Sequence, residues 1–276
     1  MIFNPKTKKL LDAYVNNPSS TVLLTGDDNL FDWPEEYLIN SLLSKEYRNN
    51  KVVIEPNEKN TIGIDQIRTL KMNLSTKVSA KNGFGRVTII KDIEKCTLEA
   101  QNSLLKLVEE PNDNNLIILE SVDTKVLTTI LSRCQKIPIL PLTKSQCANL
   151  ANERNFTEKE IEFYYFISGG NSTNFIKMVD NKLDDQIIKD YNVAKTFLTT
   201  KTDSRLQLSK DYDTKDKIYV LIDNIQKIAK LALKSNLKNK IDNRWLIILN
   251  ETMKCKELIN ENVNIKLIYL RLCTNV

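Results

Sequence analysis

The sequence contains no histidine, and this absence removes one class of mechanism. General acid–base catalysis by an imidazole is excluded, because histidine is the side chain whose ordinary pKa lies near neutrality. The five cysteines lie far apart and form no C-x-x-C pair, so no thiolate cluster is available for a zinc ion. We therefore expect no bound metal. Isolated thiols are typical of a reducing compartment, so we expect a cytoplasmic protein.

Long apolar runs are missing as well. No uninterrupted run approaches the roughly 20 residues that a membrane-spanning helix needs. The first fifteen residues lack the continuous apolar segment of a signal peptide. We expect neither a signal peptide nor contact with a membrane. The 40 lysines and arginines exceed the 35 aspartates and glutamates by five, a balance that neither requires nor excludes a nucleic acid.

Proline and glycine are absent from the C-terminal part of the chain. All seven prolines lie at or before Pro141, and the last of the six glycines is Gly170. Because both residues interrupt helices, their absence from residues 171–276 predicts an all-helical second half after a mixed α/β first half. With 276 residues the chain can form two or three domains.

Short β-branched runs predict strands in the first half, and helical segments separate them. The runs lie at residues 21–24, 51–54, 86–90 and 116–119. This alternation favours a parallel sheet with both faces covered. Apolar spacing predicts one helix over residues 64–79 and another that starts after an N-cap at Thr97 and ends at Pro111. We assign Leu98, Leu105 and Val108 to the apolar stripe of that second helix.

The stretch Pro138–Leu142 marks an exit from the first domain. Three short helices are predicted beyond it, at residues 144–152, 158–168 and 172–179, with Gly169-Gly170 as a C-cap and turn. Four or five longer helices are predicted from Leu183 onward. Their clearest apolar stripes contain Ile218, Leu221, Ile222, Ile225, Ile228, Ala229 and Ala232, and then Ile265, Ile268, Tyr269 and Leu272. We interpret these stripes as the core of a helix bundle, with an oligomer seam as the alternative.

The loop after the first predicted strand is where a parallel α/β protein would bind phosphates. Counted from Gly26, the P-loop pattern G-x-x-x-x-G-K-[ST] meets Phe31, Asp32 and Trp33 at its last three positions. Phe31 would keep a phosphate away from the backbone, and the carboxylates of Asp27, Asp28 and Asp32 would repel it. Because G-K-[ST] occurs nowhere in the chain, we expect no nucleotide cofactor of its own.

A metal ligand is also missing after the third predicted strand. An NTPase would place an acidic pair there, whereas this chain has Lys91-Asp92 and then Glu94. A lysine cannot coordinate Mg²⁺. We interpret Asp92 and Glu94 as ordinary solvated residues at a strand end.

Three blocks of sequence together resemble a known family. They are "KNTIGIDQIRTL" (59–70), "GRVTIIKDIEKCTLEAQNSLLKLVEEP" (85–111) and "VLTTILSRCQ" (126–135). In order and spacing they are similar to the delta-prime subunits of bacterial DNA polymerase III, clamp-loader proteins related to the AAA+ ATPases. The resemblance is strong over about residues 59–142 and only architectural beyond about residue 185.

The resemblance implies an α/β then all-α fold with three domains. These are a degenerate AAA+ (RecA-like) parallel-sheet domain at residues 1–142, a small helical lid domain at 143–182 and a C-terminal helical collar domain at 183–276. The implied function is that of a clamp-loader subunit without intrinsic ATPase activity, which helps to load the sliding clamp in DNA replication. The implied partners are gamma/tau and delta subunits in a hetero-pentameric ring, the sliding clamp and primed DNA.

The candidate site residues lie in the triplet Ser132-Arg133-Cys134. The resemblance implies that Arg133 is an arginine finger that acts on ATP–Mg²⁺ held by the adjacent subunit. A permanently charged guanidinium suits this role, and a finger supplied in trans is worth about 10³–10⁵ in rate in GTPases. By chemistry alone a surface arginine on a helix-to-strand turn is the simpler interpretation, and the three matching blocks reverse that preference. We expect Ser132 to hydrogen-bond the turn, and Cys134 to be a small buried residue, since no histidine can activate it.

Many members of this family carry a four-cysteine zinc module before the first matching block. Residues 43–59 contain no cysteine, so no zinc is expected here. Two other functions remain open. One is an ATP-hydrolysing motor subunit of the gamma/tau type, which the missing G-K-[ST] opposes. The other is a DNA-binding module, for which Lys77, Lys81 and Arg86 are a sparse basic set.

Overall fold

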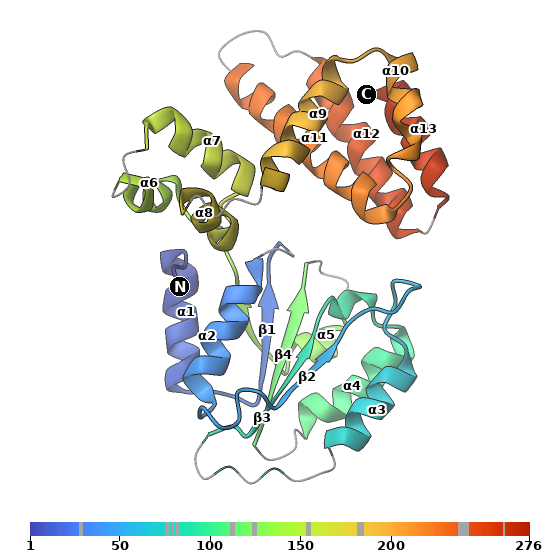
Figure 1. Ribbon diagram of the computed structural model, residues 1–276. Helices are drawn as coiled ribbons and strands as arrows, with labels where there is room; N and C mark the ends of the chain where they lie inside the picture. The colour runs from blue at the N-terminus through green and yellow to red at the C-terminus, as the bar shows by residue number, and fades with distance from the viewer. Residues whose placement is uncertain are drawn as a thin grey trace. The chain divides into compact units, whose positions relative to one another are not determined.

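The computed structural model describes residues 1–27, 30–74, 78, 80, 83–110, 114–122, 126–152, 156–180, 185–236, 243–261 and 263–276. They form two compact units, Met1–Thr143 with Asn171–Thr173, and Lys144–Gly170 with Asn174–Val276 (Figure 1). The boundary predicted between residues 182 and 183 lies outside the described residues, so the separate lid and collar domains stay a prediction. In the part of the chain that is described, no helix is long and apolar enough to cross a membrane.

A parallel sheet forms the centre of the first unit, with the described strands in the order β2-β3-β4-β1-β5 (Figure 1). The strands are β1 (Thr21–Thr25), β2 (Lys51–Ile54), β3 (Arg86–Ile90), β4 (Asn115–Ser121) and β5 (Gln135–Pro138). The first four confirm the predicted strands. The sequence did not predict β5, because this strand lies at the sheet edge and Ile137 is its buried residue. An edge strand can be mostly polar, which removes the apolar signal.

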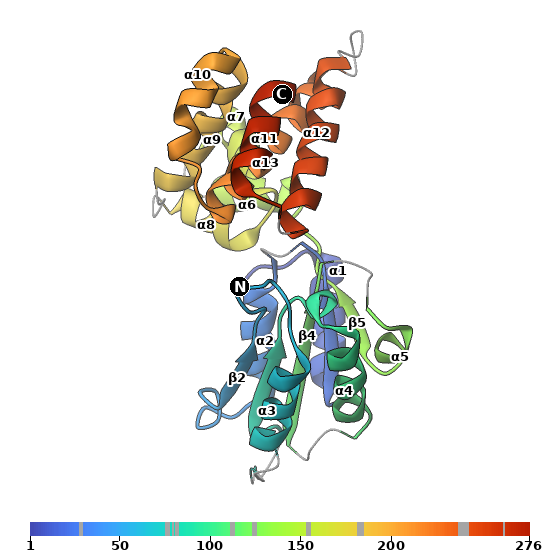
Figure 2. The ribbon, with the colours of Figure 1, turned by 90° about the vertical axis from the view of Figure 1, so that its right-hand side faces the viewer.

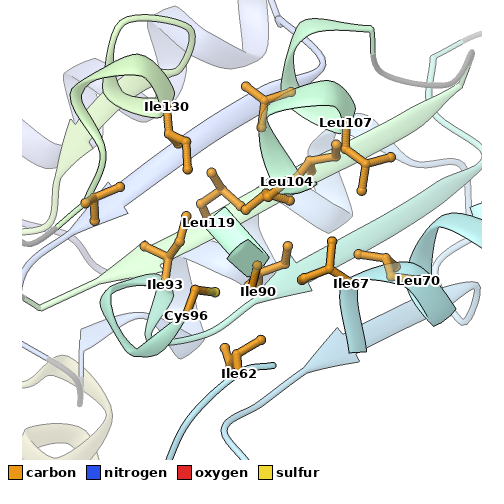
Figure 3. Packing of buried hydrophobic residues seen from close by; sticks show 14 of the residues in the cluster. Ile62, Ile67, Leu70, Ile90, Ile93, Cys96, Leu104, Leu107, Leu119 and Ile130 are labelled. Carbon is orange, nitrogen blue, oxygen red and sulfur yellow. The ribbon is translucent and has the colours of Figure 1, made fainter. Parts of the chain in front are cut away.

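Helices cover both faces of the sheet (Figures 1 and 2). On one face, α1 (Pro5–Asn16) and α2 (Asp32–Leu42) enclose a cluster that includes Tyr14, Phe31 and Leu38, called here the α2-side core. On the other, α3 (Ile64–Leu74), α4 (Leu98–Glu109) and α5 (Thr128–Leu131) enclose the α4-side core. Figure 3 shows this second cluster, with residues of β3 and β4 packed among Ile67, Leu104 and Ile130. The expected two-sided burial of the sheet is therefore confirmed.

The helix α4 starts as the sequence predicts. The Thr97 hydroxyl oxygen accepts a hydrogen bond from the backbone N–H of Ala100 at 3.2 Å, which is an N-cap. The helix ends at Glu109, and Pro111 lies outside the described residues. The assignment of Leu98 to the apolar stripe was wrong, because its side chain is 61% exposed. Leu98 precedes the buried Ala100 by two positions, which is about 200° around a helix.

The helix α3 is shorter than predicted. It ends at Leu74, whereas the apolar spacing predicted a helix to residue 79. Val78 lies outside the helix, and residues 75–77 and 79 lie outside the described residues. Ile67, Leu70 and Leu74 are buried as their spacing predicts.

The second unit begins with three helices at the predicted bounds, α6 (Lys144–Asn152), α7 (Glu158–Ser168) and α8 (Ser172–Val179). At the start of α7, Thr157 and Glu160 form a reciprocal capping box. Gly169 ends α7 with φ at 62°, a left-handed conformation that favours glycine and confirms the predicted C-cap.

The longer helices of the second unit form a bundle. They are α9 (Asp185–Thr199), α11 (Lys215–Asn236), α12 (Asn243–Asn260) and α13 (Ile265–Asn275), with the short α10 (Thr202–Gln207) between the first two. The predicted stripes of α11 and α13 lie within one buried cluster, which contains Ile218, Leu221, Ile222, Ile225, Ala229, Ile268, Tyr269 and Leu272. The bundle-core interpretation is confirmed for these residues, and Ile228 and Ile265 are partly buried against the same cluster.

Candidate functional site

The loop between β1 and α2 is short and packs against the chain itself. Gly26 donates its backbone N–H to the carbonyl of Ser121 at 3.2 Å. A Cβ at Gly26 would lie 2.6 Å from the carbonyl oxygen of Ile139, which follows β5. This glycine therefore allows a close approach of backbone to backbone, where a P-loop glycine allows the approach of a phosphate.

Phe31 occupies the place where a phosphate loop would need its second glycine. Its side chain is 3% exposed and belongs to the α2-side core. Trp33 is half-buried against the same cluster, at 6.4 Å between its ring centroid and that of Phe3. Both aromatic side chains therefore pack within the unit. Asp28 lies outside the described residues.

The first turn of α2 is acidic. Asp32 and Glu35 lie there, and they interact favourably with the positive end of the helix dipole. Glu35 is buried and forms an ion pair with Lys51, at 3.2 Å between Oε2 and Nζ. A phosphate at this helix end would meet carboxylates where a P-loop offers a lysine.

Lys91 lies at the carboxyl end of β3 among carboxylates. Its Nζ is 2.8 Å from Oε1 of Glu55, beyond the end of β2. The hydrogen bond to Glu55 raises the pKa of Lys91, desolvation opposes the rise, and the charges of Glu35 and Glu120 add to it. The partly exposed ammonium group of Lys91 therefore lies where an NTPase would present carboxylates to a metal ion.

The interpretation of Asp92 and Glu94 as solvated residues was wrong. Asp92 has φ at 48°, and its carboxylate pairs with Lys95 at 2.9 Å. Glu94 accepts hydrogen bonds from the Ser121 hydroxyl at 2.9 Å and from the Val122 N–H at 3.3 Å. Burial raises the pKa of Glu94, and these hydrogen bonds oppose the rise. The two partners lie 27 and 28 residues away in sequence, so local patterns did not reveal the contacts.

The start of α1 holds the segment that leaves β5. Asn4 donates from Nδ2 to the carbonyl of Pro141 at 2.8 Å. Thr7 donates its hydroxyl to the carbonyl of Pro138 at 3.0 Å and accepts from the N–H of Leu140 at 3.0 Å. Apart from the helix-start signature at Asn4-Pro5, no local sequence pattern indicates these contacts.

Arg133 lies in the turn between α5 and β5, at the surface. Its Nη1 donates to the carbonyl of Thr129 at 2.8 Å and to the hydroxyl of Ser132 at 3.3 Å. Its Nη2 is 2.9 Å from Oε1 of Glu109, the last residue of α4, and the two side chains are 40% and 42% exposed. The sequence did not identify Glu109 as a partner.

The two neighbours of Arg133 are structural. Ser132 donates its hydroxyl to the carbonyl of Thr129 at 3.0 Å, so the predicted hydrogen bond in the turn is confirmed. Cys134 is half-buried against the α4-side core, and burial raises the pKa of its thiol to about 11. A neutral thiol is a poor nucleophile, as expected for a packing residue.

Of the three candidate DNA-binding residues, the structure describes Arg86 alone, so it shows no basic cluster of the three. Lys77 and Lys81 lie outside the described residues, and Arg86 donates from Nη1 to the carbonyl of Asn73 at 2.9 Å, at the end of α3. Among the described residues, no group of three or more acidic or cysteine side chains is placed to hold a metal ion.

Residues 39–143 match the family model described as DNA polymerase III, delta subunit. A curated relative, DNA polymerase III subunit delta' of Buchnera aphidicola subsp. Baizongia pistaciae, is 25% identical over 225 residues, covering 79% of this chain and 64% of the relative. Subunit delta' of Bacillus subtilis is 41% identical over 58 residues, covering 21% of this chain and 18% of the relative. This chain therefore spans less than two thirds of the length of these relatives.

Among solved structures, the DNA polymerase III, gamma subunit-related protein of Thermotoga maritima has a similar fold. The TM-score is 0.55 at 18% identity, and the match covers 97% of each chain. This likeness and the five-stranded parallel sheet confirm the predicted fold class, a parallel-sheet α/β domain followed by a helical region.

Proposed function

We propose that this chain is a clamp-loader subunit of the DNA polymerase III delta-prime family, one that binds no ATP and acts on the ATP of its neighbour. The observation that carries the proposal is an exposed arginine in a unit where a buried phenylalanine side chain stands in place of the phosphate-loop glycine. Arg133 is 40% exposed, whereas Phe31 is buried in the loop that would hold a nucleotide.

The features of the loop argue against hydrolysis by this chain. Phosphoryl transfer requires a lysine and a metal ion at the β- and γ-phosphates. This chain has no G-K-[ST], and Lys91 lies where a carboxylate would hold the metal. Either change alone would weaken ATP–Mg²⁺ binding, because it removes an attraction or adds a repulsion.

Arg133 can supply positive charge to a phosphate outside the chain. A guanidinium stays protonated at any physiological pH, and its planar N–H groups match phosphate oxygens. In the proposed mechanism, Arg133 contacts the γ-phosphate of ATP–Mg²⁺ bound by an adjacent subunit. Ser132 supports it through the hydrogen bond to Nη1. Hydrolysis then requires two subunits in contact, which couples ATP turnover to assembly.

The proposed partners are those of the delta-prime family. They are ATP-binding gamma/tau subunits and a delta subunit in a hetero-pentameric ring, with the sliding clamp and primed DNA as the objects of loading. We assign ring assembly to residues 183–276, the proposed collar. Deletion of these residues should abolish co-elution with the gamma/tau and delta subunits, and retained co-elution would remove the collar assignment.

The test is the Arg133→Ala substitution in the complex reconstituted with gamma/tau and delta subunits. At the ATP site next to this chain, the rate of hydrolysis should fall by about 10³-fold, the lower end known for arginine fingers supplied in trans. The hydrolysis that remains in the complex should then come from its other ATP sites. Arg68→Ala is the matched control, because Arg68 is also an exposed, ion-paired arginine of the first unit. Size-exclusion chromatography checks that both complexes assemble.

Two results would contradict the proposal. One is a wild-type rate of clamp-stimulated hydrolysis in the Arg133→Ala complex. The other is Mg²⁺-dependent ATP binding in the micromolar range by the isolated chain, measured by calorimetry. The second result would favour an ATP-hydrolysing motor subunit.

A further inference from the structure

The guanidinium of Arg133 is engaged at both of its terminal nitrogens. Nη1 donates to the Thr129 carbonyl and the Ser132 hydroxyl, both within the α5 turn. Nη2 pairs with Glu109, which belongs to a different element, α4. Figure 2 shows α5 beside α4, so this ion pair joins the end of one helix to the turn that follows the other. Arg133 is therefore held against its own subunit.

A phosphate and the Glu109 carboxylate would compete for the same nitrogen. An arginine binds a phosphate through two parallel N–H donors, and Nη2 is the terminal nitrogen that the α5 turn leaves to other partners. If Glu109 kept its contact, its negative charge would lie beside the γ-phosphate and oppose binding. Contact with the neighbour's ATP thus requires the ion pair with Glu109 to open.

The exposure of the pair makes such opening easy. With the two side chains 40% and 42% exposed, water screens the attraction between them. An ion pair of this kind holds the arginine only weakly, whereas a triphosphate carries several negative charges. The pair can therefore hold Arg133 in an isolated or loosely assembled subunit and yield when a nucleotide is brought into contact.

We propose that Glu109 is a positioning residue. Its ion pair holds Arg133 against its own subunit and slows ATP hydrolysis until the subunit interface closes. This inference rests on the proposed function, because it concerns the same arginine acting on the same neighbouring ATP. The end of α4 is suited to the task, because the negative end of the helix dipole adds to the attraction for a guanidinium.

The test compares Glu109→Gln with Glu110→Gln in the reconstituted complex, without clamp or DNA. Glu110 is the next residue, is also exposed and caps the same helix, so its substitution removes an equal charge at nearly the same place. We expect Glu109→Gln to raise the hydrolysis rate about two- to five-fold, the range for release of an exposed ion pair. Glu110→Gln should leave the rate unchanged. Glu109→Ala should act like Glu109→Gln, and thermal unfolding checks that each variant is folded.

A double substitution shows whether the effect passes through Arg133. Glu109→Gln added to Arg133→Ala should change nothing, since no finger remains to be released. A rate for Glu109→Gln at or below that of the wild type would overturn the inference, and so would an increase that persists without Arg133. The proposed function fails separately, through a wild-type rate for Arg133→Ala alone.

Discussion

The ammonium group of Lys91 lies 2.8 Å from the carboxylate of Glu55, at the carboxyl edge of the parallel sheet. This edge is where an NTPase of similar fold would gather phosphates and a metal ion. The positive charge here is covalently part of the chain, and Glu35 and Glu120 also act on it. The lysine ammonium group therefore stands where an NTPase would bind a metal ion, and unlike a metal ion it cannot dissociate.

The first prediction concerns the charge at position 91. Lys91→Met removes one partly exposed ion pair and should lower the free energy of unfolding by less than about 1 kcal/mol. Lys91→Asp restores the carboxylate of a metal site but places it among three others. We expect it to cost about 1–2 kcal/mol more than Lys91→Met, because like charges repel at short range. Urea unfolding at neutral pH measures the difference. Equal stability of the two variants would show that the three carboxylates do not act on this position.

The second prediction concerns Gly26. A methyl group there would lie 2.6 Å from the Ile139 carbonyl oxygen, so Gly26→Ala must displace backbone. We expect a loss of about 1–3 kcal/mol in the free energy of unfolding. Gly63→Ala is the control, because a Cβ at Gly63 meets nothing within 4 Å. That variant should remain within about 0.5 kcal/mol of the wild type. If both variants unfold alike, close packing at Gly26 does not explain the glycine.

The third prediction concerns a buried arginine in the second unit. Arg205 donates to the carbonyls of Phe197, Leu198 and Cys273, and thus joins the ends of α9 and α13. Arg205→Met leaves these carbonyls without that donor and should cost about 2–4 kcal/mol. Thermal unfolding followed by circular dichroism at 222 nm, the usual signal of helix content, measures the loss. Arg244→Met is the control, since Arg244 is exposed and donates to the same Leu198 carbonyl at 3.2 Å. A loss no larger for Arg205→Met than for this control would contradict the assigned role.

Local sequence signals predicted most elements of the fold. The bounds of α6, α7 and α8 follow from apolar periodicity and from caps such as Thr157 and Gly169, whose effects act within a few residues. The N-cap at Thr97 is of the same kind. By contrast, Leu98 is apolar and next to that cap, yet it faces solvent. Position around the helix axis decided its burial, and the stripe of Ala100, Leu104 and Val108 set that position.

The contacts within the candidate site could not be predicted from local sequence patterns. Glu94 with Ser121 and Gly26 with Ile139 are pairs of residues far apart in sequence that the parallel sheet brings to one edge. A carboxylate near a strand end has the same sequence signature whether it is solvated or buried. Only its neighbours across the sheet distinguish the two cases.

The sequence by itself determined that G-K-[ST] is absent and that Lys91 follows the third strand, because residue identities can be read directly from the letters. It also identified Arg133 as the candidate that could act on another subunit. Only the tertiary structure decided what surrounds these positions. It buried Phe31 in the core, paired Lys91 with Glu55 and placed Glu109 against Arg133. The physical reason is that charge and size belong to each residue, whereas burial and pairing depend on how distant elements pack.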